Sequence, residues 1–89
     1  MNPSEQLPLG ARNVVMVYST VTVTDLDTGE NPSFQIVPDH EADISNGKYP
    51  KSAPICQALL GTILLSTVET VSLDNKPVRL KVLGIIPQG

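Results

Sequence analysis

The chain has 89 residues, 40% of them hydrophobic and 17% charged, which predicts one globular domain with a modest core and excludes a disordered chain. Six basic and nine acidic residues give a formal net charge of −3, and the basic residues are dispersed, which argues against direct, specific nucleic-acid binding. Cys56 is the single cysteine, so the chain can form neither an intramolecular disulfide nor a cysteine cluster for zinc.

The first twelve residues show no apolar period and contain Pro3, Pro8 and Gly10. We expect a flexible arm over residues 1–12, followed by a domain over residues 13–89. The arm lacks the hydrophobic segment of a signal peptide, and the longest apolar runs of the chain are far shorter than the ~20 residues that span a bilayer. We therefore expect a soluble cytoplasmic protein with no membrane partner.

The first predicted unit is a β-hairpin. Val and Thr alternate over residues 17–23, which is the period of a strand with one buried face. Residues 25–30 have turn chemistry, with Gly29 able to adopt positive φ and Asp side chains able to cap backbone amides. Residues 33–37 then predict the second strand.

The middle of the chain predicts a loop, an edge strand and one helix. Residues 38–47 are polar and acidic, and residues 48–51 follow as a short edge strand. Pro54 suits the first turn of a helix and Gly61 suits its stop, while the intervening apolar residues lie four apart. The helix is therefore expected to have about two turns.

The last predicted unit is a second hairpin, with strands over residues 68–73 and 78–86 and a turn over 74–77. Val78, Leu80 and Val82 alternate with basic residues, which indicates one buried and one solvated face. Taken in order, the elements predict an α+β domain, an antiparallel sheet with one short helix.

Four segments resemble a known family in order and spacing. They are TVTVTDLDTGE (residues 20–30), QIVPDHEAD (35–43), APICQALLG (53–61) and RLKVLGI (79–85). Together they are similar to the C-terminal domain of the bacterial Gre (GreA/GreB) transcription elongation factors. The resemblance implies an FKBP-like fold and a role in transcription as a binding module for RNA polymerase.

In Gre factors the C-terminal domain docks on the rim coiled coil of RNA polymerase, and a separate N-terminal helical hairpin enters the secondary channel and holds a catalytic magnesium. The arm over residues 1–12 is too short to form such a hairpin. The resemblance therefore implies binding without catalysis, with no cofactor and no metal. It is closest to the regulator of nucleoside diphosphate kinase, a relative with a shortened hairpin that shares Ala53-Pro54 and is thought to compete with Gre factors.

The docking determinant of Gre factors, an acidic residue, a serine and a proline, falls position by position on Ser52, Ala53 and Pro54. Only the proline is retained in kind, and losing the acidic residue removes a charge-assisted hydrogen bond. The partner-binding residues expected from the resemblance are Lys51, Ser52, Ala53, Pro54 and Ile55. Pro54 is equally explained as a first-turn helix residue, and Ile55 as a core residue.

A further departure from the family lies after the helix, where Ile63 and Leu65 are extra apolar residues. Two interpretations remain open. These side chains either form a second interface, such as a homodimer contact, or fill the face of the sheet.

Other chemistry-bearing residues have simpler explanations. Asp39, His40, Glu41 and Asp43 are residue types that bind zinc or manganese, but an acidic loop is usually only solvated. Asp25 and Asp27 resemble a general acid and base, yet capping of the turn explains both. Cys56 lies on an apolar helical stripe and is interpreted as a packing residue rather than a nucleophile.

Two other functions are retained as alternatives. One is an FKBP-like peptidyl-prolyl isomerase, whose substrate pocket resembles a cup walled by aromatic side chains. The scarcity of aromatic residues argues against it, because Tyr18, Phe34 and Tyr49 are scattered in the sequence and would not line such a pocket. The other is a general protein-interaction domain that self-associates through residues 63–65.

Overall fold

The computed structural model describes residues 14–87, so the expected arm over residues 1–12 and residues 13, 88 and 89 of the predicted domain lie outside the described part. The elements in chain order are β1 (Thr20–Asp25), β2 (Ser33–Val37), the 3-10 helices η2 (Asp39–Glu41) and η3 (Ile44–Asn46), β3 (Lys48–Pro50), α2 (Pro54–Leu59), β4 (Thr67–Val71) and β5 (Pro77–Ile86). Among these residues, no helix is long and apolar enough to cross a membrane.

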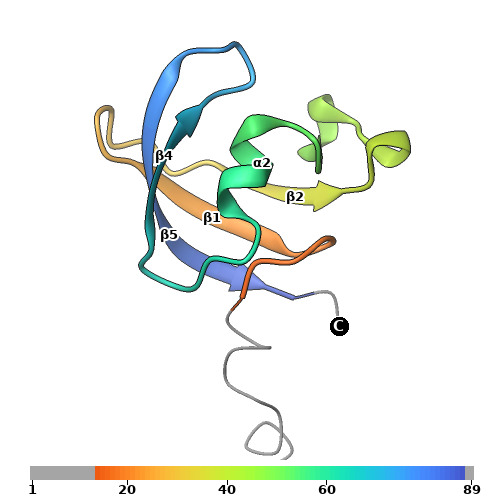
Figure 1. The fold of residues 1–89 in the computed structure, drawn as a ribbon, viewed down its shortest axis with the longest axis horizontal. Helices are drawn as coiled ribbons and strands as arrows, with labels where there is room; N and C mark the ends of the chain where they lie inside the picture. The colour runs from red at the N-terminus through yellow and green to blue at the C-terminus, as the bar shows by residue number, and fades with distance from the viewer. Residues whose placement is uncertain (1–13, 88–89) are drawn as a thin grey trace, which may run out of the picture.

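The strands form one sheet in the order β3-β2-β1-β5-β4, which curls around the helix (Figure 1). The predicted α+β class is confirmed, and both predicted hairpins form antiparallel pairs. The sheet is not wholly antiparallel as predicted, because β3 pairs with β2 in parallel. The two 3-10 turns after β2 bring the chain back before β3 starts, and a parallel pair needs such a crossover rather than a tight turn.

The first strand begins later than its Val and Thr alternation predicts. Tyr18 has a φ of 76°, a left-handed conformation that an extended strand does not contain, so β1 starts only at Thr20. The hydroxyl of Tyr18 then donates a hydrogen bond to Glu41 in η2.

A β-bulge sets the face of each side chain at the end of β5. Thr22 pairs with Gly84 while Val23 pairs with Val82, which leaves Leu83 as the extra residue. Val82 is buried, and Ile85, three residues later, packs on the same core. In a regular strand the side chains on one face are two residues apart, so Gly84 would take that place. The bulge therefore brings Ile85, rather than Gly84, onto the core face.

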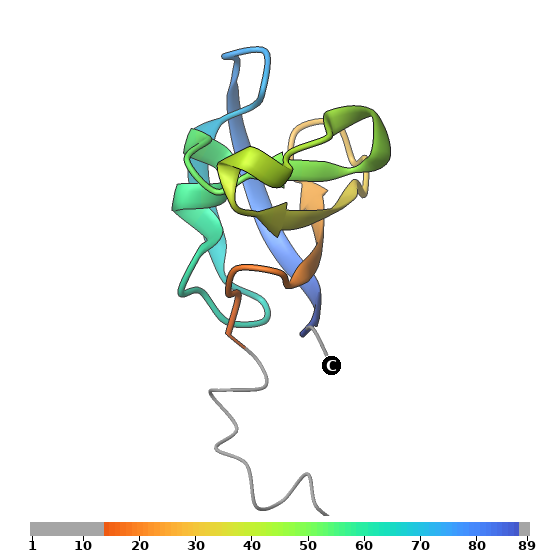
Figure 2. The same ribbon diagram turned by 90° about the vertical axis from the view of Figure 1, so that its right-hand side faces the viewer.

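The core lies between the concave face of the sheet and α2, which crosses that face in both views (Figures 1 and 2). Ile55, Cys56 and Leu59 form the buried face of α2. On the sheet side the core contains Val21, Val23, Phe34, Ile36, Leu80 and Val82. Val15 completes it, because its N–H and carbonyl bond to Thr62 and Gly61 at 2.9 Å each, just after the helix ends.

Candidate functional site

The five residues of the predicted docking segment form the link between β3 and α2. We call them the helix-start segment: Lys51, Ser52, Ala53, Pro54 and Ile55. Lys51 N–H donates to the Val37 carbonyl at 2.8 Å, and Ala53 N–H donates to the Pro50 carbonyl at 3.0 Å. Pro54 occupies the first turn of the helix and Ala53 is its N-cap, with φ −63° and ψ 140°. Backbone bonds and a proline thus hold the segment in one conformation.

The segment presents a small exposed surface above one buried anchor. Lys51, Ser52 and Pro54 are exposed, and Ala53 is half-buried. Ile55 is only 7% exposed and packs in the core, as its spacing from Leu59 predicted for a core residue. A partner docking here would contact mainly Lys51, Ser52 and Pro54.

A carboxylate lies beside the segment although position 52 is a serine. Asp39 Oδ1 accepts a hydrogen bond from the Ser52 N–H at 3.1 Å. Hydrogen bonds from the Ser52 hydroxyl and backbone lower the pKa of Asp39 below its ordinary value. Asp39 is exposed and ionised at neutral pH, so η2 places a negative charge next to the helix start.

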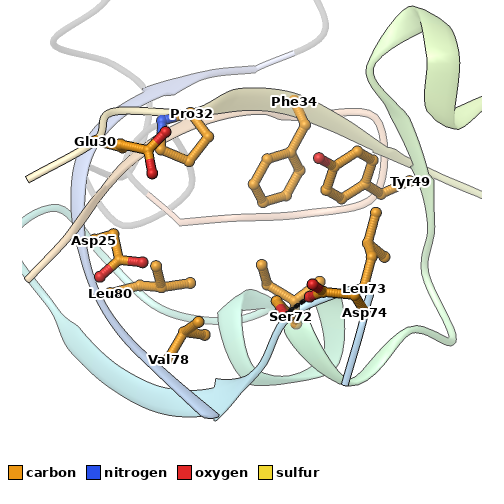
Figure 3. A pocket seen from close by; sticks show the side chains of 11 residues that line it. Asp25, Glu30, Pro32, Phe34, Tyr49, Ser72, Leu73, Asp74, Val78 and Leu80 are labelled. Carbon is orange, nitrogen blue, oxygen red and sulfur yellow. Dashed lines mark hydrogen bonds between the residues drawn. The ribbon is translucent and has the colours of Figure 1, made fainter. Parts of the chain in front are cut away.

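A groove of about 310 Å³ lies between the side chains drawn in Figure 3. Ile55 also lines it, so the groove adjoins the helix-start segment. Its apolar lining consists of Phe34, Tyr49, Ile55, Leu73, Val78 and Leu80. Three acidic side chains also border it, namely Asp25, Glu30 and Asp74.

Two of the three aromatic residues converge in this groove, so the expectation that the aromatics are scattered is wrong. The rings of Phe34 and Tyr49 stack with their centroids 4.3 Å apart and an angle of 8° between their planes. They are brought together because β2 and β3 pair in parallel, with Tyr49 opposite Ile36. The stacked rings form one flat wall rather than an enclosing cup (Figure 3).

The second predicted interface lies beyond the other end of α2, in a turn that we call the apolar turn (residues 63–66). Ile63 and Leu65 are 53% and 65% exposed, so the interpretation that they fill the sheet face is wrong. Leu65 N–H donates to the Val82 carbonyl at 2.8 Å, and Val82 N–H donates to the Ser66 carbonyl at 2.9 Å, which fixes the turn against β5. Its role as an interface stays a prediction.

The remaining candidate residues have structural roles. Asp25 Oδ1 accepts bonds from the N–H groups of Asp27 and Thr28, at 2.9 and 3.2 Å, as turn capping predicts. The carboxylate of Asp27 pairs with Arg79 at 2.9 Å. Cys56 is fully buried, and desolvation raises the pKa of its thiol to about 12, so it is protonated at neutral pH and packs in the core as predicted.

The acidic loop after β2 does not gather its side chains around a common point. Asp39, His40, Glu41 and Asp43 are all exposed. Within residues 14–87 no three His, Cys, Asp or Glu side chains lie close enough to hold a metal ion together. Asp39 bonds to Ser52, and Asp43 accepts bonds from Ser45 and Asn46.

Comparison with known proteins identifies the family. Residues 10–87 match the family described as "Transcription elongation factor, GreA/GreB, C-term". The chain belongs to this family. We call the matched part of the chain the Gre-type domain. It is 34% identical over 79 residues to transcription elongation factor GreA of Staphylococcus carnosus, and the match covers 89% of this chain and 49% of that protein. It is 41% identical over 61 residues to GreA of Neisseria meningitidis, covering 68% of this chain and 37% of that protein.

Solved structures confirm the fold of the Gre-type domain. The crystal structure of GreA factor homolog 1 (Gfh1) of Thermus thermophilus superimposes with a TM-score of 0.74 at 26% identity, over 93% of this chain and 53% of that one. The structure of the transcription elongation factor GreA/GreB from Nitrosomonas europaea superimposes with a TM-score of 0.71 at 24% identity, over 97% of this chain and 68% of that one. The chain spans about half or less of the length of the GreA proteins of Staphylococcus carnosus and Neisseria meningitidis.

The groove is the feature of the Gre-type domain that sequence reasoning missed. Its residues come from the end of β1 and the turn after it, from β2, β3 and α2, and from β5 and the turn before it, and no local pattern connects them. Sequence reasoning had no signal for Leu73, because residues 68–73 were predicted as a strand, whereas β4 ends at Val71 and Leu73 lies in the turn before β5.

Proposed function

We propose that this Gre-type domain is a non-catalytic binding module for bacterial RNA polymerase. It docks on the rim coiled coil through the helix-start segment and thereby alters the access of secondary-channel factors in the cytoplasm. Membership of the GreA/GreB family carries this proposal, because the matched region is the family's C-terminal domain. The exposed, hydrogen-bonded helix-start segment supports it.

The carboxylate of Asp39 supports docking at this position. Gre factors are expected to have an acidic residue where this chain has Ser52, and Asp39 lies within hydrogen-bond distance of that residue. An exposed carboxylate beside Pro54 can accept a charge-assisted hydrogen bond from a partner. Although position 52 is a serine, Asp39 of η2 therefore supplies a negative charge at this surface.

Among Gre relatives, we place the chain nearest to the regulator of nucleoside diphosphate kinase. Ala53-Pro54 at the helix start supports this narrower assignment. It implies competition with Gre factors for the same rim without transcript cleavage. Family membership disfavours the prolyl isomerase alternative, and the groove has one flat aromatic wall where an isomerase needs a cup.

Binding of the purified chain to bacterial core RNA polymerase tests the proposal. Biolayer interferometry with immobilised chain should show saturable binding that excess GreA displaces. Pro54→Asn should weaken binding about tenfold while changing the free energy of unfolding by less than ~1 kcal/mol. Pro87→Asn is the matched control, since Pro87 is exposed and lies beyond β5. Absence of binding, or binding that GreA does not displace, would contradict the proposal.

Self-association through the apolar turn is a second candidate function. The exposure of Ile63 and Leu65 favours it, because neighbouring large apolar side chains are seldom left in water without a partner. Size-exclusion chromatography with light scattering should then show a dimer that Leu65→Ser dissociates. A monomer at the highest soluble concentration would exclude this function.

A further inference from the structure

We infer that the Gre-type domain pairs with a second copy of itself through one uncharged end of the molecule, of which the apolar turn is only a part. This inference rests on the self-association proposed above and names the whole contact surface. It does not depend on polymerase binding, because the helix-start segment lies at the other end of α2 (Figure 1).

Three segments that are distant in sequence meet at this end, and we call them together the uncharged end: residues 14–16, 60–66 and 82–87. None of the three contains an Asp, Glu, Lys, Arg or His residue. Val14 forms an antiparallel bridge with Ile63, and the Leu65 N–H donates to the Val82 carbonyl at 2.8 Å. Both views show the three segments at the same end of the fold (Figures 1 and 2).

Large hydrophobic side chains at the uncharged end face water. Their exposed fractions run from 38% to 65%, and they are Met16, Ile63, Leu64, Leu65, Leu83 and Ile86. A single exposed hydrophobic residue is ordinary on a protein surface. Several of them on adjoining segments, with no charged residue among them, are typical of an interaction site.

Leu65 is exposed in a backbone conformation that a leucine does not favour. Its φ of 69° lies in the left-handed region, which glycine adopts without strain. The turn is fixed by the bond from Leu65 to Val82 and by the Ile63 N–H, which donates to the Ser66 hydroxyl at 3.2 Å. Leu65 therefore stabilises neither the turn nor the core, and contact with a second molecule explains a leucine here. A fixed turn also loses little entropy on association.

The charge distribution selects a second copy as the partner. The formal net charge of −3 makes two copies repel each other at long range. Contact through the uncharged end desolvates no charge and brings no like charges into opposition, so this repulsion is smallest there. A two-fold axis places the same patch on both sides of the contact, so apolar surface of both copies is removed from water.

Pairing through the uncharged end leaves both helix-start segments free. Each lies at the start of α2, whereas residues 60–66 follow the end of that helix (Figure 1). The pair is therefore bivalent, with one docking segment on each copy.

Sedimentation equilibrium of the full chain and its variants tests the inference. Leu65→Gly removes the side chain and relieves the positive φ, so it should raise the dissociation constant of the dimer at least tenfold without destabilising the fold. Leu83→Ser changes a different segment of the same end and should raise the constant about fivefold. Urea unfolding at a concentration where the chain is monomeric should show both variants folded.

Two controls make the test specific to this surface. Leu26→Ser alters a leucine of matched exposure, 43% against 44% for Leu83, in the acidic turn after β1. It should leave the dissociation constant within about twofold. Raising the NaCl concentration from about 0.1 M to about 1 M should leave the constant unchanged or lower it, because salt screens the repulsion and the contact contains no ion pair.

The outcomes separate this inference from the functions proposed above. A dimer that Leu65→Gly dissociates while Leu83→Ser does not would overturn the inference and leave self-association through the apolar turn standing. A dimer that Leu26→Ser weakens equally, that neither leucine variant weakens, or that salt dissociates would also overturn it. A monomer at the highest soluble concentration would refute self-association and this inference together, whereas binding to polymerase is measured separately and is unaffected by either result.

Discussion

Replacing Leu59 with alanine tests whether α2 is held by core packing. The Leu59 side chain is 0% exposed and lies on the buried face of the helix with Ile55 and Cys56. A helix of six residues is too short to be stable alone, so its contacts with the sheet must hold it. We therefore expect Leu59→Ala to lower the free energy of unfolding strongly.

The size of the loss follows from burial. Leu59→Ala removes three carbon atoms, and at ~0.8 kcal/mol for each buried CH₂ the lost transfer free energy is about 2.4 kcal/mol. The residual cavity adds to this, so we expect a total loss of ~3 kcal/mol. Since a domain of this length has a total stability of roughly 5–13 kcal/mol, the variant should still fold.

Urea unfolding followed by far-UV circular dichroism measures this loss. Leu65→Ala is the matched control, because it is the same chemical change at an exposed position and should cost less than ~0.5 kcal/mol. A loss below ~1.5 kcal/mol for Leu59→Ala, or equal losses for both variants, would refute the packing of α2 described above.

Three further predictions follow from the described geometry. Because burial raises the pKa of Cys56 to about 12, Ellman's reagent at pH 8 should modify native protein roughly a hundredfold more slowly than urea-unfolded protein; equal rates would contradict its burial. Hydrogen bonds from Ser52 lower the pKa of Asp39 below the ordinary value of 3.8. The stabilisation from this bond is therefore fully present above pH 3.8 and is lost as the pH falls through the lower pKa of the folded state. The amide resonance of Ser52 should titrate with a midpoint below 3.8, and Asp39→Asn should abolish that titration; a midpoint above 3.8 would count against the bond. Leu65 has a φ of 69°, so Leu65→Gly should be more stable than Leu65→Ala by about 1 kcal/mol in urea unfolding, and the opposite order would show that the turn is not strained.

The sequence predicts those parts of the fold that depend on neighbouring residues. β2 has the predicted bounds, Ser33–Val37, because its alternation and its flanking turn signals are both local. Pro54 starts α2 as expected, since proline suits only the first turn of a helix. The direction of β3 was not predictable, because it depends on the path of two 3-10 turns through a loop that has no period.

The candidate site was predictable only in part, for the same physical reason. The helix-start segment is continuous in sequence, so a motif can identify it. The groove is assembled from Glu30, Tyr49 and Leu73, which come together only after the sheet curls around α2. A bulge adds to the difficulty, since Ile85 faces the core only because of one extra residue in β5.

The position of Ile55 determines which residues can report on binding alone. Its side chain packs in the core, lines the groove and follows Pro54 at the helix start. Truncating it would remove a buried side chain and a groove wall together, so weaker binding would not distinguish lost contact from lost stability. Pro54 and Leu73 are both exposed, and only Leu73 lines the groove. A double-mutant cycle on those two positions therefore measures whether the partner contacts the helix start and the groove independently.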